Sequence, residues 1–165
     1  MREFHLANTF NTMNLSLRQK LFNACLDYVN MRIDTSKQAM ANAQESANAE
    51  EKSSAGDIYE TGRAMMQIER DKAAQQLNES MKLKQVLDQI NNTEVRQSVV
   101  SLGSVVITSS GPHFYVAIST GKIQIDGVEY IALAPQSPIG KALLGLKVND
   151  TFMYNNKSCT ITEIA

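Results

Sequence analysis

The chain has 165 residues, two cysteines and a formal net charge of −1, and 43% of its residues are hydrophobic. This apolar share is too high for a disordered tail, and the near-zero charge excludes a nucleic-acid binder that works through a broad basic surface. Cys25 and Cys159 have no His or Cys neighbour at ligand spacing, so we expect buried, reduced thiols and neither a zinc site nor a disulfide framework.

Proline and glycine divide the chain near residue 100. All three prolines and six of the eight glycines follow this point, whereas only Gly56 and Gly62 precede it. Because these residues interrupt regular structure, we predict an α+β fold with long helices first and short strands later. The expected parts are an N-terminal extension, an antiparallel coiled-coil hairpin and a C-terminal antiparallel β domain with one short helix, over residues 1–15, 16–95 and 96–165.

The first helix is expected to begin near Ser16, a candidate N-cap, and the second to run from about Asp57 to Ile90. Apolar residues recur at helical spacing along both. The first helix carries two neighbouring rows, Leu17, Leu21, Ala24, Cys25 and Tyr28, and Phe22, Leu26, Val29, Ile33 and Met40. The second carries Met66, Ala73, Leu77, Ser80, Leu83, Leu87 and Ile90. Such narrow stripes are typical of two helices that pack only on each other.

The two helical segments are of equal length, about 50 Å each at 1.5 Å per residue. Equal arms indicate an antiparallel hairpin with its turn at Lys52–Gly56. The distal part is expected to project into solvent unless a partner receives it. The main structural alternative is an adaptor whose helical half self-associates in parallel as a coiled coil.

Acidic residues crowd the expected turn. Glu50 and Glu51 would end the first helix, where negative charge is disfavoured by about 0.3–1 kcal/mol each, and Asp57 and Glu60 would begin the second, where it is favoured. The cluster fits either a solvated turn or the binding of a hard cation through carboxylate oxygens. No EF-hand spacing is present, so a metal at this turn would take its other ligands from a partner.

The second half of the chain alternates short apolar runs with turns. Strands are expected at 104–108, 114–119, 122–125, 128–133, 151–154 and 159–164. Asp126-Gly127 is a two-residue hairpin signal, and Asn155-Asn156 is a weaker one. Between the strands, Ser137, Pro138 and Gly145 mark the cap, first position and end of a short helix.

The segments "SLGSVVIT", "SPIGKALLGLKVNDTF" and "CTITEI" resemble the C-terminal domain of the Gre family of bacterial transcription elongation factors. The positions that match the family's central run are Ser137, Pro138, Gly140, Lys141, Ala142, Leu143, Gly145, Val148 and Asp150. Lys147 stands one place later than the family's usual lysine, and Asn149 replaces the usual glycine. Asparagine tolerates a left-handed backbone, so the turn is expected to survive.

The resemblance implies a fold and a partner. Gre-like proteins join a long antiparallel hairpin to a domain similar to FK506-binding proteins, which docks on the rim of the RNA polymerase secondary channel. The hairpin enters the channel, and its tip acids help to hold a second Mg²⁺ in the polymerase active site, which then cleaves the RNA of a backtracked complex. This implies a cytoplasmic, monomeric factor that binds core RNA polymerase, contacts nascent RNA indirectly and is not itself an enzyme.

The family's tip motif Gly-Asp-x-x-Glu is met by Gly56–Glu60, which makes Asp57 and Glu60 the implied ligands of the shared Mg²⁺. An alignment on the later "QIERDK" instead places Glu51 near the first acid and Ser54 near the second. Glu50 and Glu51 therefore remain candidate tip acids. The implied polymerase-docking residues are Gln136, Ser137, Pro138 and Lys141.

Three other functions compete with transcript cleavage. Because Ile58 and Tyr59 differ from the small polar residues usual between the two acids, an inhibitory, anti-cleavage member of the family remains open. A prolyl isomerase would need an aromatic-lined pocket, for which few aromatics follow residue 100; the third alternative is the coiled-coil adaptor. No run of about 18 apolar residues occurs, so no membrane span is expected, and the N-terminus lacks the apolar core of a signal peptide.

Overall fold

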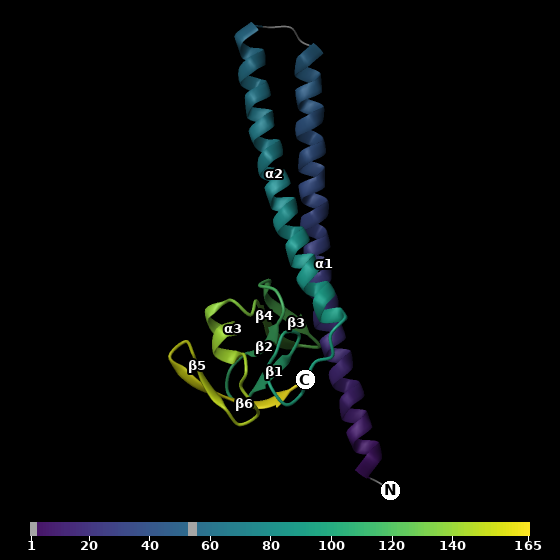
Figure 1. The fold of residues 1–165 in the computed structure, drawn as a ribbon, viewed down its shortest axis with the longest axis vertical. Helices are drawn as coiled ribbons and strands as arrows, with labels where there is room; N and C mark the ends of the chain where they lie inside the picture. Colours follow the sequence, from purple (N-terminus) through teal and green to yellow (C-terminus); the bar gives the residue numbers. More distant parts are fainter. Residues whose placement is uncertain (1–2, 53–55) are drawn as a thin grey trace. The chain divides into compact units, whose positions relative to one another are not determined.

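The computed structural model describes the backbone of residues 3–52 and 56–165 and the side chains of residues 17–49 and 60–165. Two long helices come first, α1 (Glu3–Lys52) and α2 (Gly56–Asn91) (Figure 1). α1 begins at Glu3 and not at Ser16, because no proline or glycine separates the two positions and serine is tolerated inside a helix. Residues 53–55 of the expected turn lie outside the described residues.

The chain divides into two compact units, the first formed by Met1–Leu26 with Val86–Ala165 and the second by Asp27–Gln85. In the second unit α1 and α2 run antiparallel. Ser36 of α1 lines one groove with Gln76 of α2, and further along α1 Ala47 lines another groove with Met66, which is earlier in α2. The predicted antiparallel pairing of the two helices is therefore confirmed within this unit.

Small side chains fill the seam between the helices of the second unit. Among the described side chains of this unit, the buried ones are Val29, Ile33, Ser36, Ala43, Ala73 and Ser80. The Ser80 hydroxyl donates to the Gln76 carbonyl oxygen at 2.9 Å, which satisfies the polar group inside the seam. Val29, Ile33, Ala73 and Ser80 belong to the stripes expected from the sequence, whereas Ser36 and Ala43 extend them.

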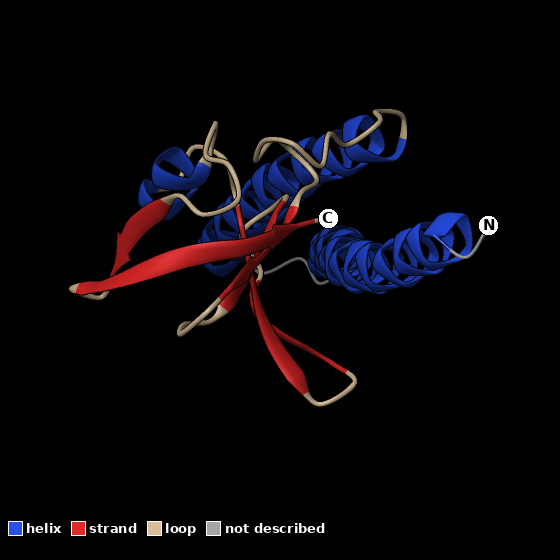
Figure 2. Cartoon of the chain, turned by 90° about the horizontal axis from the view of Figure 1, so that it is seen from below, coloured by secondary structure: helices blue, strands red, loops and turns tan. Residues whose placement is uncertain are grey.

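The first unit contains one twisted six-stranded sheet (Figure 2). Its strands are β1 (Val105–Thr108), β2 (His113–Val116), β3 (Gly121–Ile125), β4 (Val128–Leu133), β5 (Thr151–Tyr154) and β6 (Lys157–Ile164), in the order β3-β4-β2-β1-β6-β5. β2 and β4 pair in parallel, so the sheet is mixed and not antiparallel throughout as expected. The parallel pair arises because β3 first crosses to the sheet edge and the β3–β4 hairpin then returns beside β2.

Both predicted two-residue turns are present. Asp126 and Gly127 have φ of 50° and 82° and join β3 to β4, and Asn155 and Asn156 have φ of 48° and 62° and join β5 to β6. Positive φ at both central positions is the turn geometry whose twist matches that of the flanking strands. The Asp-Gly and Asn-Asn pairs therefore fix the registers Ile125↔Val128 and Tyr154↔Lys157.

The core of the first unit lies between the sheet and the short helix α3 (Pro138–Leu143). Leu143 of α3 is fully buried, as are Phe114, Val116 and Ile161 of the sheet. The Phe114 ring meets the rings of Phe152 and Tyr154 edge-on, with centroids 5.7 and 5.3 Å apart. Such edge contacts contribute beyond the burial of area.

Both cysteines are free and buried, as predicted from their spacing. Within the described ranges, neither the long helices nor α3 carries an apolar stretch long enough to cross a lipid bilayer.

Candidate functional site

The predicted tip acids flank the end of α1 and the beginning of α2. Glu50 and Glu51 lie in the last turn of α1, and Asp57 is the second residue of α2; the side chains of these three lie outside the described residues. Glu60 is exposed on α2. Its i, i+3 spacing from Asp57 places the two positions on adjacent rows of the helix surface, so α2 brings the two motif positions together.

The candidate tip residues are all acids, so they offer only carboxylate oxygens as metal ligands. Among the described residues, no group of three or more His, Cys, Asp or Glu is placed to hold a metal ion. Glu60 offers an exposed carboxylate on a helix end, which is a suitable oxygen donor for a hard cation but is only one ligand. The shared Mg²⁺ therefore stays a prediction, with Glu60 and Asp57 as candidate donors.

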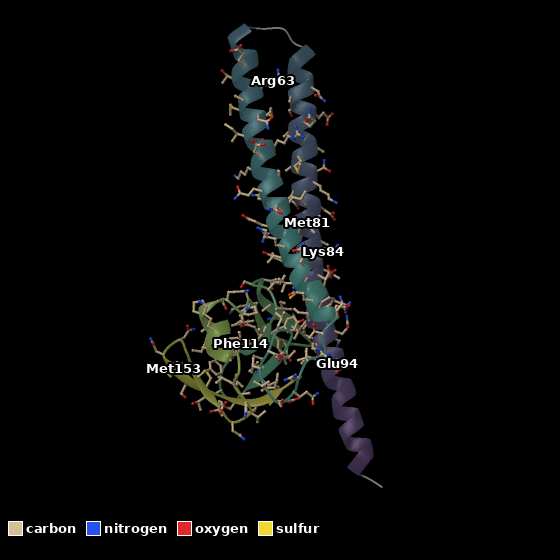
Figure 3. The ribbon with its side chains drawn as sticks, viewed as in Figure 1. Arg63, Met81, Lys84, Glu94, Phe114 and Met153 are labelled. Atoms are coloured by element: carbon tan, nitrogen blue, oxygen red, sulfur yellow. The ribbon has the colours of Figure 1, made fainter. Side chains whose placement is uncertain are left out.

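Two arginines follow the tip acids along α2: Arg63 lies one turn after Glu60, and Arg70 lies two turns further. Arg63, which is labelled in Figure 3, and Arg70 line a groove between the helices of the second unit. The groove has a volume of about 130 Å³ and is also lined by the amides of Gln44, Asn48 and Gln67. The seven-residue spacing of the arginines places them on the same side of the helix. The sequence showed this spacing, but only the pairing of α1 with α2 shows that amide side chains complete a positive groove.

The loop before α3 carries the predicted docking residues. Ser137 caps α3: its hydroxyl accepts from the Gly140 N–H at 3.0 Å and donates to the Ala134 carbonyl at 2.7 Å. Pro138 occupies the first position of the helix, where its missing N–H leaves no bond unmade. Gln136, Pro138 and Lys141 are exposed. The Ser137 hydroxyl is committed to the cap, whereas these three side chains are accessible to a partner.

Gly140 allows the loop and α3 to approach closely. A Cβ at this position would lie 2.8 Å from the Pro135 carbonyl oxygen and still closer to that of Ala134. Both obstacles are backbone atoms, which cannot rotate away as a flexible side chain can. The absence of a side chain at Gly140 therefore permits a close approach of α3 to residues 134–135 that any other residue would prevent.

The turn that precedes β5 keeps its shape despite the asparagine at the position usual for glycine. Asn149 has a φ of 74°, which confirms the expected left-handed conformation. The Asp150 carboxylate accepts a hydrogen bond from the Lys147 N–H at 2.7 Å and so closes the turn. Lys147 and Asp150 thus have a structural role here.

No family model matches the chain, and no curated protein is similar to it in sequence. Several solved structures are similar to it. The GreA factor homolog 1 (Gfh1) protein of Thermus thermophilus is 19% identical, with a TM-score of 0.33, and the match covers 84% of this chain and 93% of that one. Gfh1 of Thermus aquaticus is 18% identical over 86% and 94% of the two chains, with a TM-score of 0.31.

A further structure, described as the transcription factor Gfh1, is 20% identical over 87% of this chain and 92% of the other, with a TM-score of 0.30.

A polar cluster inside the first unit has no counterpart among the sequence predictions. Burial raises the pKa of Cys25 to about 11, while the nearby Thr120 hydroxyl acts to lower it. The Thr120 hydroxyl nevertheless lies outside hydrogen-bonding geometry, and the buried Tyr115 hydroxyl also has no hydrogen-bond partner. No sequence signal distinguishes Tyr115 here, because it stands inside an apolar strand where burial of the whole side chain is expected.

Proposed function

We propose that this chain is a Gre-like transcription factor that binds core RNA polymerase and acts within its secondary channel. The two-helix arm would carry Asp57 and Glu60 to the polymerase active site, and the exposed residues Gln136, Pro138 and Lys141 would contact the channel rim. The observation that carries the proposal is the Gly-Asp-x-x-Glu motif at the start of α2, which places two acids on adjacent rows beside the helix end.

Other features support this proposal. The helical arm and the β unit are the two parts that the resemblance implies, and the matched run from Ser137 to Asp150 forms α3 and the turn before β5. The Ser137 cap and Gly140 fix the loop that would face the polymerase. In the arm, Glu60 is exposed and Arg63 lies one turn further along α2. The factor would act as a monomer and touch nascent RNA only indirectly.

In this scheme the polymerase performs the chemistry. A second Mg²⁺ supplies activation of the water that hydrolyses a phosphodiester bond. Asp57 and Glu60 would each donate a carboxylate oxygen to that ion, and helix α2 would fix the spacing between them. Negative charge near a helix N-terminus is favoured by the exposed N–H groups and the dipole, so the start of α2 suits these two acids.

Stalled, backtracked elongation complexes test the proposal directly. Adding the protein during a Mg²⁺ titration is expected to increase the rate of transcript cleavage. Asp57→Asn and Glu60→Gln should each reduce the stimulation by about tenfold or more, since even outer-shell changes at metal sites have effects of this size. Glu69→Gln, another exposed acid of α2, is the matched control and should leave the stimulation unchanged.

A double variant, Glu50→Gln with Glu51→Gln, decides between the two alignments of the tip. If this variant loses stimulation while Asp57→Asn keeps it, the acids of α1 are the ligands. If the protein fails to capture core polymerase from solution, the proposed function itself is wrong.

An inhibitory factor is the second candidate. Ile58 and Tyr59 replace the small polar residues usual between the two acids, and bulky groups there would favour occupation of the channel without efficient metal delivery. The same assay separates the two: an inhibitor captures polymerase and slows cleavage. A prolyl isomerase is disfavoured, because it would need an aromatic-lined pocket, whereas Phe114 and Phe152 are buried in the core of the β unit.

A further inference from the structure

The connection between β1 and β2, residues 109–112, is closed by hydrogen bonds that meet at Thr108, the last residue of β1. The Thr108 hydroxyl donates to the Pro112 carbonyl oxygen at 3.1 Å and accepts from the Gly111 N–H at 3.3 Å. The Thr108 N–H donates to Nδ1 of His113, the first residue of β2, at 3.2 Å. Of these three bonds, only the one to His113 involves a titratable group.

The position of Thr108 in the sheet explains why its N–H needs a side-chain acceptor. β1 pairs with β2 at Val106↔Phe114, and continuing this register places Thr108 opposite Pro112, before β2 begins. The Pro112 carbonyl accepts from the Thr108 hydroxyl. Thr108 is only 5% exposed, and buried N–H groups in native proteins are nearly always paired. The His113 ring therefore supplies the acceptor that the end of the sheet lacks.

The surroundings of the His113 ring favour its neutral form. The ring is half-buried, and its centroid lies 5.6 Å from that of the buried Tyr130 on β4. The charged groups on this side are Glu163 of β6, two strands away in the register, and Asp126 of the β3–β4 turn, which pairs with Lys20; both carboxylates act on Tyr130. Burial lowers the pKa of His113.

Protonation of His113 is incompatible with this arrangement. An imidazolium carries N–H groups on both nitrogens, so Nδ1 becomes a donor that faces the Thr108 N–H, which is also a donor. The buried Thr108 N–H would then lose its acceptor, and a charge would stand in a half-buried position, which are both unfavourable. The protonated ring therefore has to leave, and the connection loses one of its three closing bonds.

The same connection covers a buried thiol. A Cβ built at Gly111 would lie 2.9 Å from Sγ of Cys159 on β6, and Cys159 is free and buried. Residues 109–112 thus lie directly against this sulfur atom, so their release would expose it to solvent.

We propose that His113 acts as a pH-sensitive switch on the β1–β2 connection: the neutral ring holds residues 109–112 against Thr108 and Cys159, and protonation releases them. In the released form the ring lies in water with an ordinary pKa of about 6.5. The released fraction should therefore rise by up to about tenfold for each pH unit below this value. The switch involves none of the tip or docking residues, so it stands apart from the polymerase function proposed above.

NMR of the full chain between about pH 5 and 8, the range in which histidine titrates, tests the switch without any substitution. Histidine nitrogen spectra should show the proton of neutral His113 on Nε2 and a pKa below 6.5. The protection of the Thr108 amide against hydrogen exchange, corrected for the intrinsic exchange rate, should fall by up to about tenfold per pH unit below 6.5.

Thiol labelling with a dithiodipyridine reagent reports on the connection itself. Labelling of each cysteine is located by peptide mapping and divided by its rate in the unfolded chain at the same pH. The relative rate for Cys159 should rise over the same pH range as the Thr108 amide loses protection. Cys25, the other buried thiol, should stay protected, because unfolding of the whole unit would expose both.

His113→Gln separates the proton from the hydrogen bond. The glutamine Oε1 can accept from the Thr108 N–H but does not titrate, so both pH responses should disappear while the protection at neutral pH is kept. His5→Gln, at the other histidine of the chain, is the matched control and should keep both responses. The proposal is overturned if Thr108 protection or Cys159 labelling does not change with pH, if His113→Gln responds as the unsubstituted protein does, or if Cys25 is labelled in parallel with Cys159.

Discussion

Gly140→Ala tests the close approach between α3 and the loop that precedes it. An alanine Cβ would sit 2.8 Å from the Pro135 carbonyl oxygen, 2.9 Å from the Pro135 carbonyl carbon and closer still to the Ala134 oxygen. The Ala134 oxygen cannot easily retreat, because it accepts from the Ser137 hydroxyl at 2.7 Å and from the Ser137 N–H at 3.0 Å. Both hydrogen bonds would be strained by the substitution.

The size of the effect follows from two opposing terms. Alanine favours a helix interior over glycine by about 1 kcal/mol, whereas overpacking of this kind typically costs about 1–3 kcal/mol and more when only backbone can move. We expect a net loss of about 2 kcal/mol in the free energy of unfolding. Urea unfolding followed by near-ultraviolet circular dichroism of the tyrosines, which are concentrated in the β unit, measures it.

The matched control is Gly145→Ala. Gly145 has a φ of 83°, and a Cβ there would meet nothing within 4 Å, so its cost of about 1–2 kcal/mol is backbone strain alone. If Gly140→Ala unfolds at the same urea concentration as the unsubstituted chain, the contact between α3 and residues 134–135 is not as described. A stable Gly140→Ala protein would also show that the position of the loop before α3 does not depend on a glycine at residue 140.

Three further predictions concern burial and pH. Burial raises the pKa of Cys25 to about 11 in the folded protein, so the free energy of unfolding should be unchanged below pH 9 and fall by roughly 2 kcal/mol as the pH rises to 11. Urea unfolding at a series of pH values measures this fall, which should be absent in Cys25→Ala. Burial lowers the pKa of His113, whose Nδ1 accepts from the Thr108 N–H at 3.2 Å. The free energy of unfolding should therefore fall as the pH drops below 6.5, and this fall should be smaller in His113→Gln. Leu87→Ala removes a fully buried side chain and should cost about 2–5 kcal/mol, against less than about 0.5 kcal/mol for the exposed Gln89→Ala.

Local chemistry accounts for the parts of the fold that the sequence predicted well. The two-residue turns at Asp126-Gly127 and Asn155-Asn156 and the Ser137 cap each depend on a few adjacent residues, and each is present. The helix start was misplaced because Ser16 can cap a helix but does not have to, and nothing in the preceding residues stops α1.

Features that depend on contacts between distant parts of the chain were harder to predict from the sequence. The parallel pairing of β2 with β4 leaves no local signal, because the alternation of apolar residues is the same for either direction. Ser36 was absent from the expected stripe of the first helix, although it is buried in the seam. Cys25, Tyr115 and Thr120 stand in different parts of the sequence, so only the fold shows that these polar groups lie close together in the first unit.

The small side chains in the seam of the second unit should make that unit open more readily than the sheet. Among the described side chains of this seam, four of the six buried ones are alanine or serine, and only Val29 and Ile33 are larger. Such a seam buries little apolar area, and regions with few apolar contacts open at lower free energy than a packed core. Backbone amides near Ala43 and Ala73 should exchange with deuterium before those of β1 and β6. Substitutions in this seam should therefore loosen the arm and leave the separately packed core of the sheet intact.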